Sequence, residues 1–228
     1  MAHHPPPQWD AGAGLLVARF RHGPLWNFSY LVACEATGEA AVIDPAWDAV
    51  GILEAAAGRG LRVTTVLLTH GHSDHVNGVT EILAAGARAF VHAGDEPGVR
   101  AHTSDATTFA EAESFGLGRL SIAVHHTPGH TPGSVSYVVA GRLFTGDTLA
   151  IGSPGTPGPE AGSLEALWQS TLSLRGLAPE TRLHPGHDSG PEPTATIETE
   201  RLRNAGLRAA SLEEFRAAVE RATGRSHQ

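Results

Sequence analysis

The segment at residues 69–75 constrains the fold of this chain more than any other. It contains His70, His72, Asp74 and His75, so that three imidazoles and one carboxylate fall within six residues. An apolar, β-rich run at residues 63–68 precedes it, and a pattern typical of a helix follows it. Binding sites in α/β folds gather at the carboxyl ends of strands. Imidazole and carboxylate groups at such a point are suitable ligands for zinc, iron or manganese.

The length and composition are those of a globular protein with a sizeable core. The chain has 228 residues, of which 41% are hydrophobic, and no linker-like stretch divides it. We therefore expect a flexible N-terminal tail at residues 1–14 and a single domain at residues 15–228. The tail has no apolar segment of the kind found in secretory signals, and no apolar run reaches about 18 residues. The sequence predicts a cytoplasmic protein without a membrane span.

The charge balance argues against nucleic acid as a partner. The formal net charge is −8, and all 16 basic residues are arginine. A nucleic-acid-binding surface normally requires concentrated positive charge. We therefore expect a small-molecule substrate, no nucleic acid and no membrane, while nothing in the sequence indicates an oligomeric state. The single cysteine, Cys34, is expected to be a small buried hydrophobic residue.

The order of the expected elements indicates an α/β fold with two similar halves. Strands are expected at residues 15–20, 28–34, 39–43, 63–68, 87–91, 120–124, 134–140, 143–145 and 181–183. Helices are expected from Asp48 to Gly58, from the histidine-rich segment to Ala85, from Ser163 to Leu172, and at residues 194–207 and 211–222. Residues 102–118 and 152–162 are expected to form loops. Mixed sheets with helices on their outer faces satisfy this pattern.

Three later segments also place a ligand-type side chain next to an apolar strand. His130 lies between two Pro-Gly pairs in the segment at residues 126–133. Asp147 ends an apolar strand, and His187 follows another in the segment at residues 184–188. A lone histidine of this kind is more often structural, but four such segments together predict a metal site.

The ordered set of four segments resembles the metallo-β-lactamase superfamily. The resemblance extends from about residue 27 to about residue 207, and it implies an αββα sandwich of two mixed β-sheets with helices on the outer faces. Within the superfamily, the segments at residues 126–133, 145–149 and 184–188 are similar to the branch that contains hydroxyacylglutathione hydrolase (glyoxalase II) and persulfide dioxygenase. The resemblance therefore implies an enzyme, and a metal-dependent hydrolase in the first place.

The family pattern implies a role for each of seven side chains. It places His70, His72 and His130 on one metal ion and Asp74, His75 and His187 on a second, with Asp147 bridging the two. The expected cofactors are two divalent ions, zinc in the first place, with iron or manganese as alternatives. A metal-bound hydroxide, oriented with the help of Asp74, would attack the carbonyl carbon of a thioester or another activated ester.

Alternative functions use the same residues or a part of them. A persulfide dioxygenase would bind a single iron through His70, His130 and Asp147. A nuclease of the same superfamily and a non-catalytic metal-binding protein are further alternatives. Asp44 and Asp95 end strands, and for both we expect a structural role or a role in supporting the metal ligands rather than metal binding.

The loop after Asp147 departs from the pattern of the branch. Thr156 occupies the position where an arginine that could grip a substrate carboxylate is expected. We therefore expect the loop at residues 152–158 to lie at the mouth of the site and to hold the carboxylates of glutathione poorly. Uncharged or small acyl thioesters or esters should be the better substrates.

Overall fold

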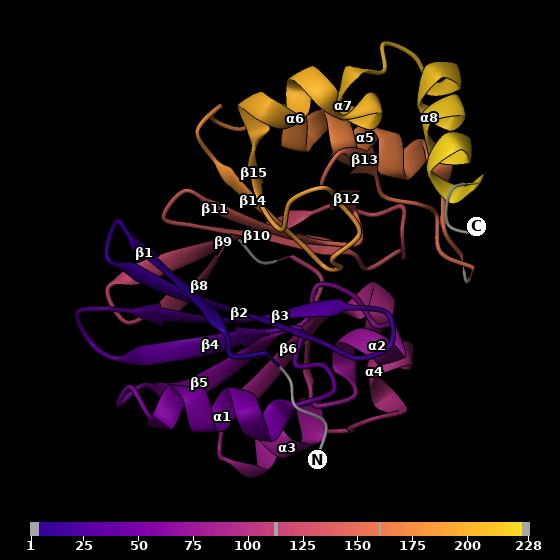
Figure 1. Ribbon diagram of the computed structural model, residues 1–228. Helices are drawn as coiled ribbons and strands as arrows, with labels where there is room; N and C mark the ends of the chain where they lie inside the picture. The colour runs from indigo at the N-terminus through magenta and orange to yellow at the C-terminus, as the bar shows by residue number, and fades with distance from the viewer. Residues whose placement is uncertain (1–4, 112–113, 160, 225–228) are drawn as a thin grey trace.

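Two β-sheets pack face to face in the computed structural model, which describes residues 5–111, 114–159 and 161–224 (Figure 1). The first sheet has the order β1-β2-β3-β4-β5-β6-β7. Its strands are β1 (Gln8–Gly12), β2 (Leu15–His22), β3 (Asn27–Cys34), β4 (Glu39–Ile43), β5 (Arg62–Leu67), β6 (Arg88–His92) and β7 (Thr107–Phe109). Strands β1 to β4 pair antiparallel and β4 to β7 pair parallel, so the sheet is mixed.

The second sheet is also mixed and has the order β15-β14-β11-β10-β9-β8. Its strands are β8 (Ser114–Leu117), β9 (Leu120–His126), β10 (Val135–Val139), β11 (Arg142–Gly146), β14 (Arg182–Pro185) and β15 (Ala195–Thr196). Strands β11 and β14 pair parallel, and the other neighbours pair antiparallel. A short ladder of β12 (Leu149–Ala150) and β13 (Ser153–Pro154) follows the end of β11.

Helices cover the outer face of each sheet, as Figure 1 shows. The helical segments between the strands of the first sheet are α1 (Ala49–Ala57), α2 (Ser73–Val76), α3 (Val79–Ala84), a short 3₁₀ turn η1 (Ala93–Asp95) and α4 (Glu96–Arg100). The second sheet is covered by α5 (Leu164–Arg175), α6 (Ile197–Arg203), α7 (Ala205–Arg208) and α8 (Leu212–Gly224). The expected αββα sandwich is therefore confirmed. Within the described ranges, no helix combines the length and apolarity that crossing a membrane requires.

Buried side chains fill three layers between these elements. One cluster lies between the sheets and includes Tyr30, Ile43, Leu67, Tyr137 and Phe144. A second cluster joins the first sheet to α1 and α3, and a third joins the second sheet to α5 and α7. Because β3 has neighbours on both faces, all eight of its residues are buried, including the polar Asn27 and Ser29.

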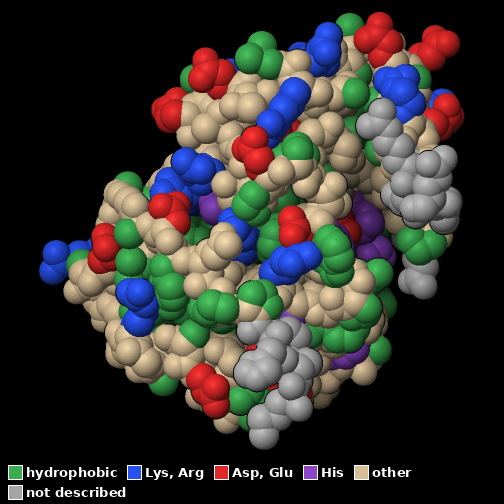
Figure 2. Space-filling model, in the orientation of Figure 1, with side chains coloured by type: hydrophobic (Ala, Val, Ile, Leu, Met, Phe, Trp, Pro, Cys, Tyr) green, Lys and Arg blue, Asp and Glu red, His purple; other side chains and the backbone are tan. Residues whose placement is uncertain are grey.

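Strand ends bring the candidate site together at one edge of the sandwich. Strands β4, β5 and β6 run parallel, so the segments after Ile43, Leu67 and His92 leave the first sheet on the same side. The parallel strands β11 and β14 do the same in the second sheet. On the face seen in Figure 2, arginine and acidic side chains are interspersed, and histidine side chains reach the surface between the two halves.

Four expectations about local structure were wrong. Residues 8–12 do not belong to a flexible tail but form edge strand β1, because they pair with β2 and Trp9 packs beneath the guanidinium of Arg59 at 4.0 Å. His3 and His4 of the expected tail lie outside the described residues. The expected loop at residues 102–118 contains β7 and β8, where Phe109 and Phe115 pack on each other at 5.5 Å.

The other two differences have simple physical causes. The loop at residues 152–162 begins with β13, because Leu149–Ala150 offers it a paired strand. The helix expected at residues 194–207 is divided into α6 and α7 at Asn204, whose side chain accepts hydrogen bonds from the backbone N–H groups of Gly206 and Leu207. Such a cap starts a new helix rather than continuing the old one.

Candidate metal centre

Three imidazoles form the first half of the candidate metal centre. His70 and His72 come from the loop after β5, and His130 comes from the turn between β9 and β10. The ring centroids lie 4.7 to 4.8 Å apart, and Nδ1 of His72 lies 2.9 Å from Nε2 of His130. Their ligand atoms fall within the spacing that one metal ion requires. We call these three residues the first triad.

Two imidazoles and a carboxylate form the second half. Nε2 of His75 lies 3.1 Å from Nε2 of His187, and Oδ2 of Asp74 lies 3.7 and 3.5 Å from these two atoms. Asp74 and His75 lie in α2, while His187 follows β14 in the opposite sheet. We call these three residues the second triad. It meets the same spacing requirement as the first.

Asp147 lies between the two triads. Its carboxylate oxygens are 3.5 Å from Nε2 of His130, 3.5 Å from Nε2 of His75 and 3.4 Å from Nε2 of His187. The structure therefore gathers all seven side chains that the sequence singled out into one cluster. Their binding of metal stays a prediction, and the geometry places Asp147 where a bridging ligand would lie.

The imidazoles direct free lone pairs toward the centre of this cluster. The Nδ1 atoms of His75, His130 and His187 are hydrogen-bonded to Asp44 Oδ2, Thr156 O and Leu25 O, which can only accept. Each Nδ1 must therefore be protonated, so Nε2 is the ring atom that can bind a metal ion when the imidazole is neutral. Nε2 of His70 and Oδ1 of Asp147 are buried and have no hydrogen-bond partner among the described residues. A set of inward lone pairs without donors fits a cation.

Asp44 supports the centre from behind. With His70 and His75 it forms another group of metal-type side chains. However, both of its oxygens are already engaged. Oδ1 accepts from the Thr69 backbone N–H, and Oδ2 accepts from the Thr69 hydroxyl at 2.6 Å and from Nδ1 of His75 at 3.1 Å. Asp44 therefore orients His75 rather than facing an ion, in agreement with the supporting role expected from the sequence.

The charges within the cluster shift the pKa values of its side chains in both directions. Burial acts to raise the pKa of Asp147, but the neighbouring His75 and His187 outweigh it and hold that pKa well below its usual range. Burial acts to lower the pKa of His187, but the carboxylate of Asp147 outweighs it and raises that pKa to about 9. Burial lowers the pKa of His70 well below its usual range. In the metal-free centre Asp147 is thus ionised and His70 neutral at pH 7, whereas His187 carries a proton that a bound metal ion would displace.

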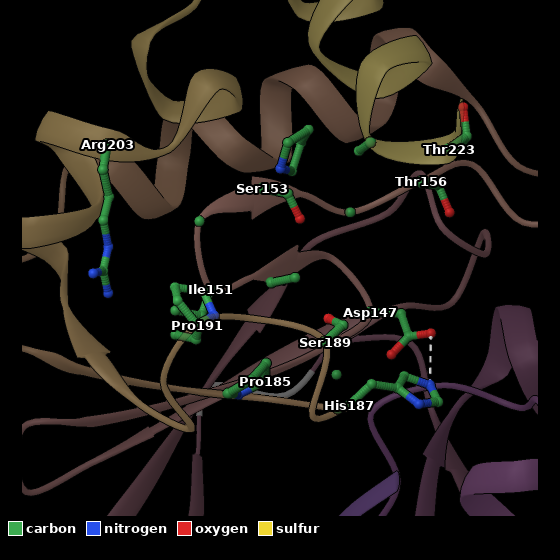
Figure 3. A pocket seen from close by; sticks show the side chains of 17 residues that line it. Asp147, Ile151, Ser153, Thr156, Pro185, His187, Ser189, Pro191, Arg203 and Thr223 are labelled. Atoms are coloured by element: carbon green, nitrogen blue, oxygen red, sulfur yellow. Dashed lines mark ion pairs between the residues drawn. The ribbon is translucent and has the colours of Figure 1, made fainter. Parts of the chain in front are cut away.

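A cavity of about 850 Å³ opens beside the second triad (Figure 3). Asp147 and His187 lie at one end, and residues 150–156, including Thr156, line it as expected for the loop at the mouth. Arg203 of α6 lies at the other end, beyond Ile151. Apart from Asp147, His187 and Arg203, the lining contains glycine, alanine, proline, isoleucine, serine and threonine.

Sequence reasoning missed the cation in this cavity and the anchor of its loop. Arg203 donates to Glu200 through Nε at 2.7 Å and lies 3.4 Å from Glu192, so two carboxylates offset its charge. Glu200, fully buried, also accepts from the backbone N–H of Gly152 at 2.7 Å. Asn204 donates to the carbonyl oxygens of Ala150 and Ser153. The available signal in the sequence was the pair Glu200 and Asn204, which lie about one helical turn apart in the helix expected at residues 194–207.

Asn27 is a further residue that the sequence did not identify. Its side chain donates to Oδ2 of Asp74 at 2.9 Å and accepts from the indole N–H of Trp47 at 2.9 Å. It thereby fixes the carboxylate of the second triad from the start of β3. Nothing in the local sequence indicates this contact, because 47 positions separate Asn27 from Asp74.

The comparison with known families agrees with this geometry. The model of the metallo-beta-lactamase superfamily matches residues 23–187, a range that includes all seven side chains of the cluster. The chain belongs to the metallo-β-lactamase superfamily. Membership implies a dinuclear metal site, for which the two triads and Asp147 are the candidate ligands.

Individual relatives indicate which branch of the superfamily this chain resembles. A hydroxyacylglutathione hydrolase from Rhodospirillum rubrum is 39% identical over 194 residues, which cover 82% of this chain and 72% of that protein. The chain spans only 61% and 62% of two further hydroxyacylglutathione hydrolases that it matches. Among solved structures, ETHE1 from Myxococcus xanthus has a TM-score of 0.76 and 28% identity, covering 90% of this chain and 89% of its own. TTHA1623 in a di-iron-bound form has a TM-score of 0.68 and 30% identity, covering 82% of this chain and 98% of its own.

Proposed function

We propose that this protein is a metal-dependent hydrolase that cleaves a thioester or another activated ester, as the relatives named hydroxyacylglutathione hydrolase suggest. The observation that supports the proposal best is the meeting of two complete triads at Asp147, beside a cavity large enough for a small molecule. We further propose zinc as the metal and the cytoplasm as the location.

The seven side chains of the cluster have different proposed roles. His70, His72 and His130 would hold one ion, Asp74, His75 and His187 the other, and Asp147 would keep the two together. Two divalent ions held there would supply an activated water at neutral pH and a Lewis acid for the substrate carbonyl group. Asp74, whose Oδ2 is held by the Asn27 side chain, would orient the attacking water. No serine or cysteine nucleophile is needed for this chemistry.

The cavity favours an uncharged acyl group or leaving group. Its lining is mainly aliphatic and backbone, and the cation Arg203 is already paired with Glu200 and Glu192. Thr156 supplies a hydroxyl where the branch pattern has an arginine. Among the residues that line the cavity, a carboxylate of glutathione would find one guanidinium, that of Arg203, which is paired with two carboxylates but whose Nη2 has no hydrogen-bond partner in the described part of the chain. We propose small, uncharged thioesters or esters as the preferred substrates.

A persulfide dioxygenase with one iron is the second candidate. The three residues that it would need lie together, with His130 3.5 Å from Asp147 and the rings of His70 and His130 4.8 Å apart. The second triad is equally well assembled, however, and a one-iron enzyme would leave it without a role. Because the dioxygenase ligands are a subset of the hydrolase ligands, the ligand set alone does not separate the two functions, and the relatives named hydroxyacylglutathione hydrolase favour the hydrolase.

Assays with defined metals test the proposal. Protein stripped with a chelator is reloaded with zinc or with iron(II) and then supplied with an uncharged acyl thioester, S-lactoylglutathione or glutathione persulfide. We expect zinc to restore thioester cleavage, fastest on the uncharged substrate. Oxygen uptake with the persulfide in the iron-loaded protein, without thioester cleavage in either form, would establish the dioxygenase instead. Absence of both activities would overturn the enzyme assignment for these substrates.

A further inference from the structure

Asp95 occupies a buried position behind the first triad. It ends the 3₁₀ turn η1 after β6, and only 5% of it is exposed. Its Oδ2 accepts hydrogen bonds from the backbone N–H of Gly71 at 2.9 Å and from the hydroxyl of Thr131 at 2.5 Å. Its Oδ1 accepts from the backbone N–H of Gly133 at 2.8 Å. One carboxylate thus satisfies donors from two separate loops.

These two loops carry all three residues of the first triad. Gly71 lies between His70 and His72, and Thr131 directly follows His130. The loops leave different sheets, since one follows β5 and the other joins β9 to β10. The position of His130 relative to His70 and His72 therefore depends on what holds the loops together. Asp95 makes hydrogen bonds to both at once.

The second triad has supports of its own. Asp44 holds His75, the Asn27 side chain holds Asp74, and Leu25 O holds His187. None of the hydrogen bonds described for Asp95 reaches any of the three. A substitution of Asp95 should consequently affect the first triad and not the second.

The two loops pack so closely against Asp95 that side chains larger than glycine would not fit at Gly71 and Gly133. A Cβ atom on Gly71 would come within 2.6 Å of the Asp95 carbonyl oxygen, and one on Gly133 would come within 2.6 Å of Asp95 Oδ1. Side chains at these two positions would push the loops away from the carboxylate. Glycine at positions 71 and 133 therefore allows the two loops to lie close enough to Asp95 for its hydrogen bonds to form.

We propose that Asp95 is a positioning residue for the first triad, which sets the spacing of His130 from His70 and His72 and thereby the metal affinity of that half. The proposal rests on the dinuclear centre of the proposed function. Carboxylates that support metal ligands typically contribute roughly ten-fold to a hundred-fold in metal affinity. An asparagine would present an N–H group to one of the donor loops, and an alanine would leave the Gly71 and Gly133 N–H groups without acceptors.

The test measures metal binding at each triad rather than activity. Asp95→Asn and wild type are titrated with zinc against a chromophoric chelator, and anomalous diffraction at limiting zinc gives the occupancy of each triad. We expect roughly ten-fold to a hundred-fold weaker binding at the first triad and little change at the second. The matched control is Asp105→Asn, an exposed aspartate whose side chain accepts from the Ser104 hydroxyl, and it should bind zinc as wild type does.

Two results would overturn the positioning role. One is unchanged zinc affinity in Asp95→Asn, and the other is an equal loss at both triads together with a lower melting temperature of the metal-free protein. Thr131→Val serves if Asp95→Asn does not fold, because it removes one of the three hydrogen bonds and should shift binding in the same direction by less. The outcome is separate from that of the activity assays, since a selective loss of zinc would support the role of Asp95 even in a protein that cleaves no thioester.

Discussion

Thr156 accepts a hydrogen bond from Nδ1 of His130 through its backbone carbonyl oxygen, at 2.7 Å. The loop that lines the cavity and a ligand of the first triad are therefore connected directly. Because the bond uses the backbone of Thr156, its side chain can be replaced without removing the support of His130. Substrate selection and metal binding can thus be changed separately at this position.

The first prediction follows from this separation. Thr156→Arg should lower the KM for a glutathione thioester roughly ten-fold or more, because a guanidinium–carboxylate pair contributes about 1.5–3 kcal/mol. Steady-state kinetics on S-lactoylglutathione measure the change. The KM for an uncharged ester is the control and should move much less, and the zinc content should stay as in wild type. If wild type already binds glutathione conjugates at micromolar concentrations and the substitution has no effect, the loop does not determine specificity.

The second prediction concerns the bridge. Asp147→Asn keeps the size of the side chain but removes the charge that would hold two cations close together. We expect the variant to lose at least one metal ion per chain and most of its activity while its far-UV circular dichroism stays native. Elemental analysis and the thioester assay measure both effects. Full metal content with full activity would rule out bridging by Asp147.

The third prediction concerns Glu200, which anchors the cavity loop at Gly152, and tests whether this loop can be changed without loss of metal. Glu200 is buried and accepts from Gly152 N–H, Asn204 and Arg203. Glu200→Gln should reduce the free energy of unfolding by about 1.5–3 kcal/mol, because it weakens hydrogen bonds to a buried charge. It should also raise KM with little change in zinc content. The exposed Glu198 on the same helix gives the control, Glu198→Gln, and equal effects in both variants would refute the anchoring role.

The fourth prediction is a stabilising substitution. His184 is 3% exposed, and neither ring nitrogen has a hydrogen-bond partner among the described residues. Its ring stacks on Phe144 at 4.8 Å and meets Tyr30 edge-on at 5.4 Å. His184→Phe should keep these contacts and remove about 1 kcal/mol of desolvation cost, so Tm should rise by about 2–4 °C. A lower Tm in a calorimetric scan would indicate that the imidazole has a polar role in the core.

The candidate site was predictable because its ligand-type residues lie in short, recognisable segments of the sequence. His70, His72, Asp74 and His75 lie within one loop and helix start, and His130, Asp147 and His187 each lie close to a recognisable apolar strand. Parallel strands then bring such ends to the same edge of a sheet. The structure adds the registers and distances, which no local pattern contains.

The parts that sequence reasoning missed depend on contacts between distant residues. Arg203 enters the cavity only because α6 packs over the loop at residues 150–156, and Thr156 supports His130 across 26 positions. Strand β7 has three residues and exists because β6 offers it a partner. Edge strand β1 likewise depends on pairing with β2. Tertiary pairing overrides weak local preference in both strands.

The number of metal ions per chain tests the central claim most directly. Protein purified from cells grown without metal supplementation is analysed for metal content by mass spectrometry, and the same sample is assayed for thioester cleavage. The two triads joined at Asp147 predict about two ions per chain, with zinc the main metal, and cleavage that is lost on chelation and restored with zinc. One iron per chain, with oxygen uptake on a persulfide and no thioester cleavage, would contradict the account.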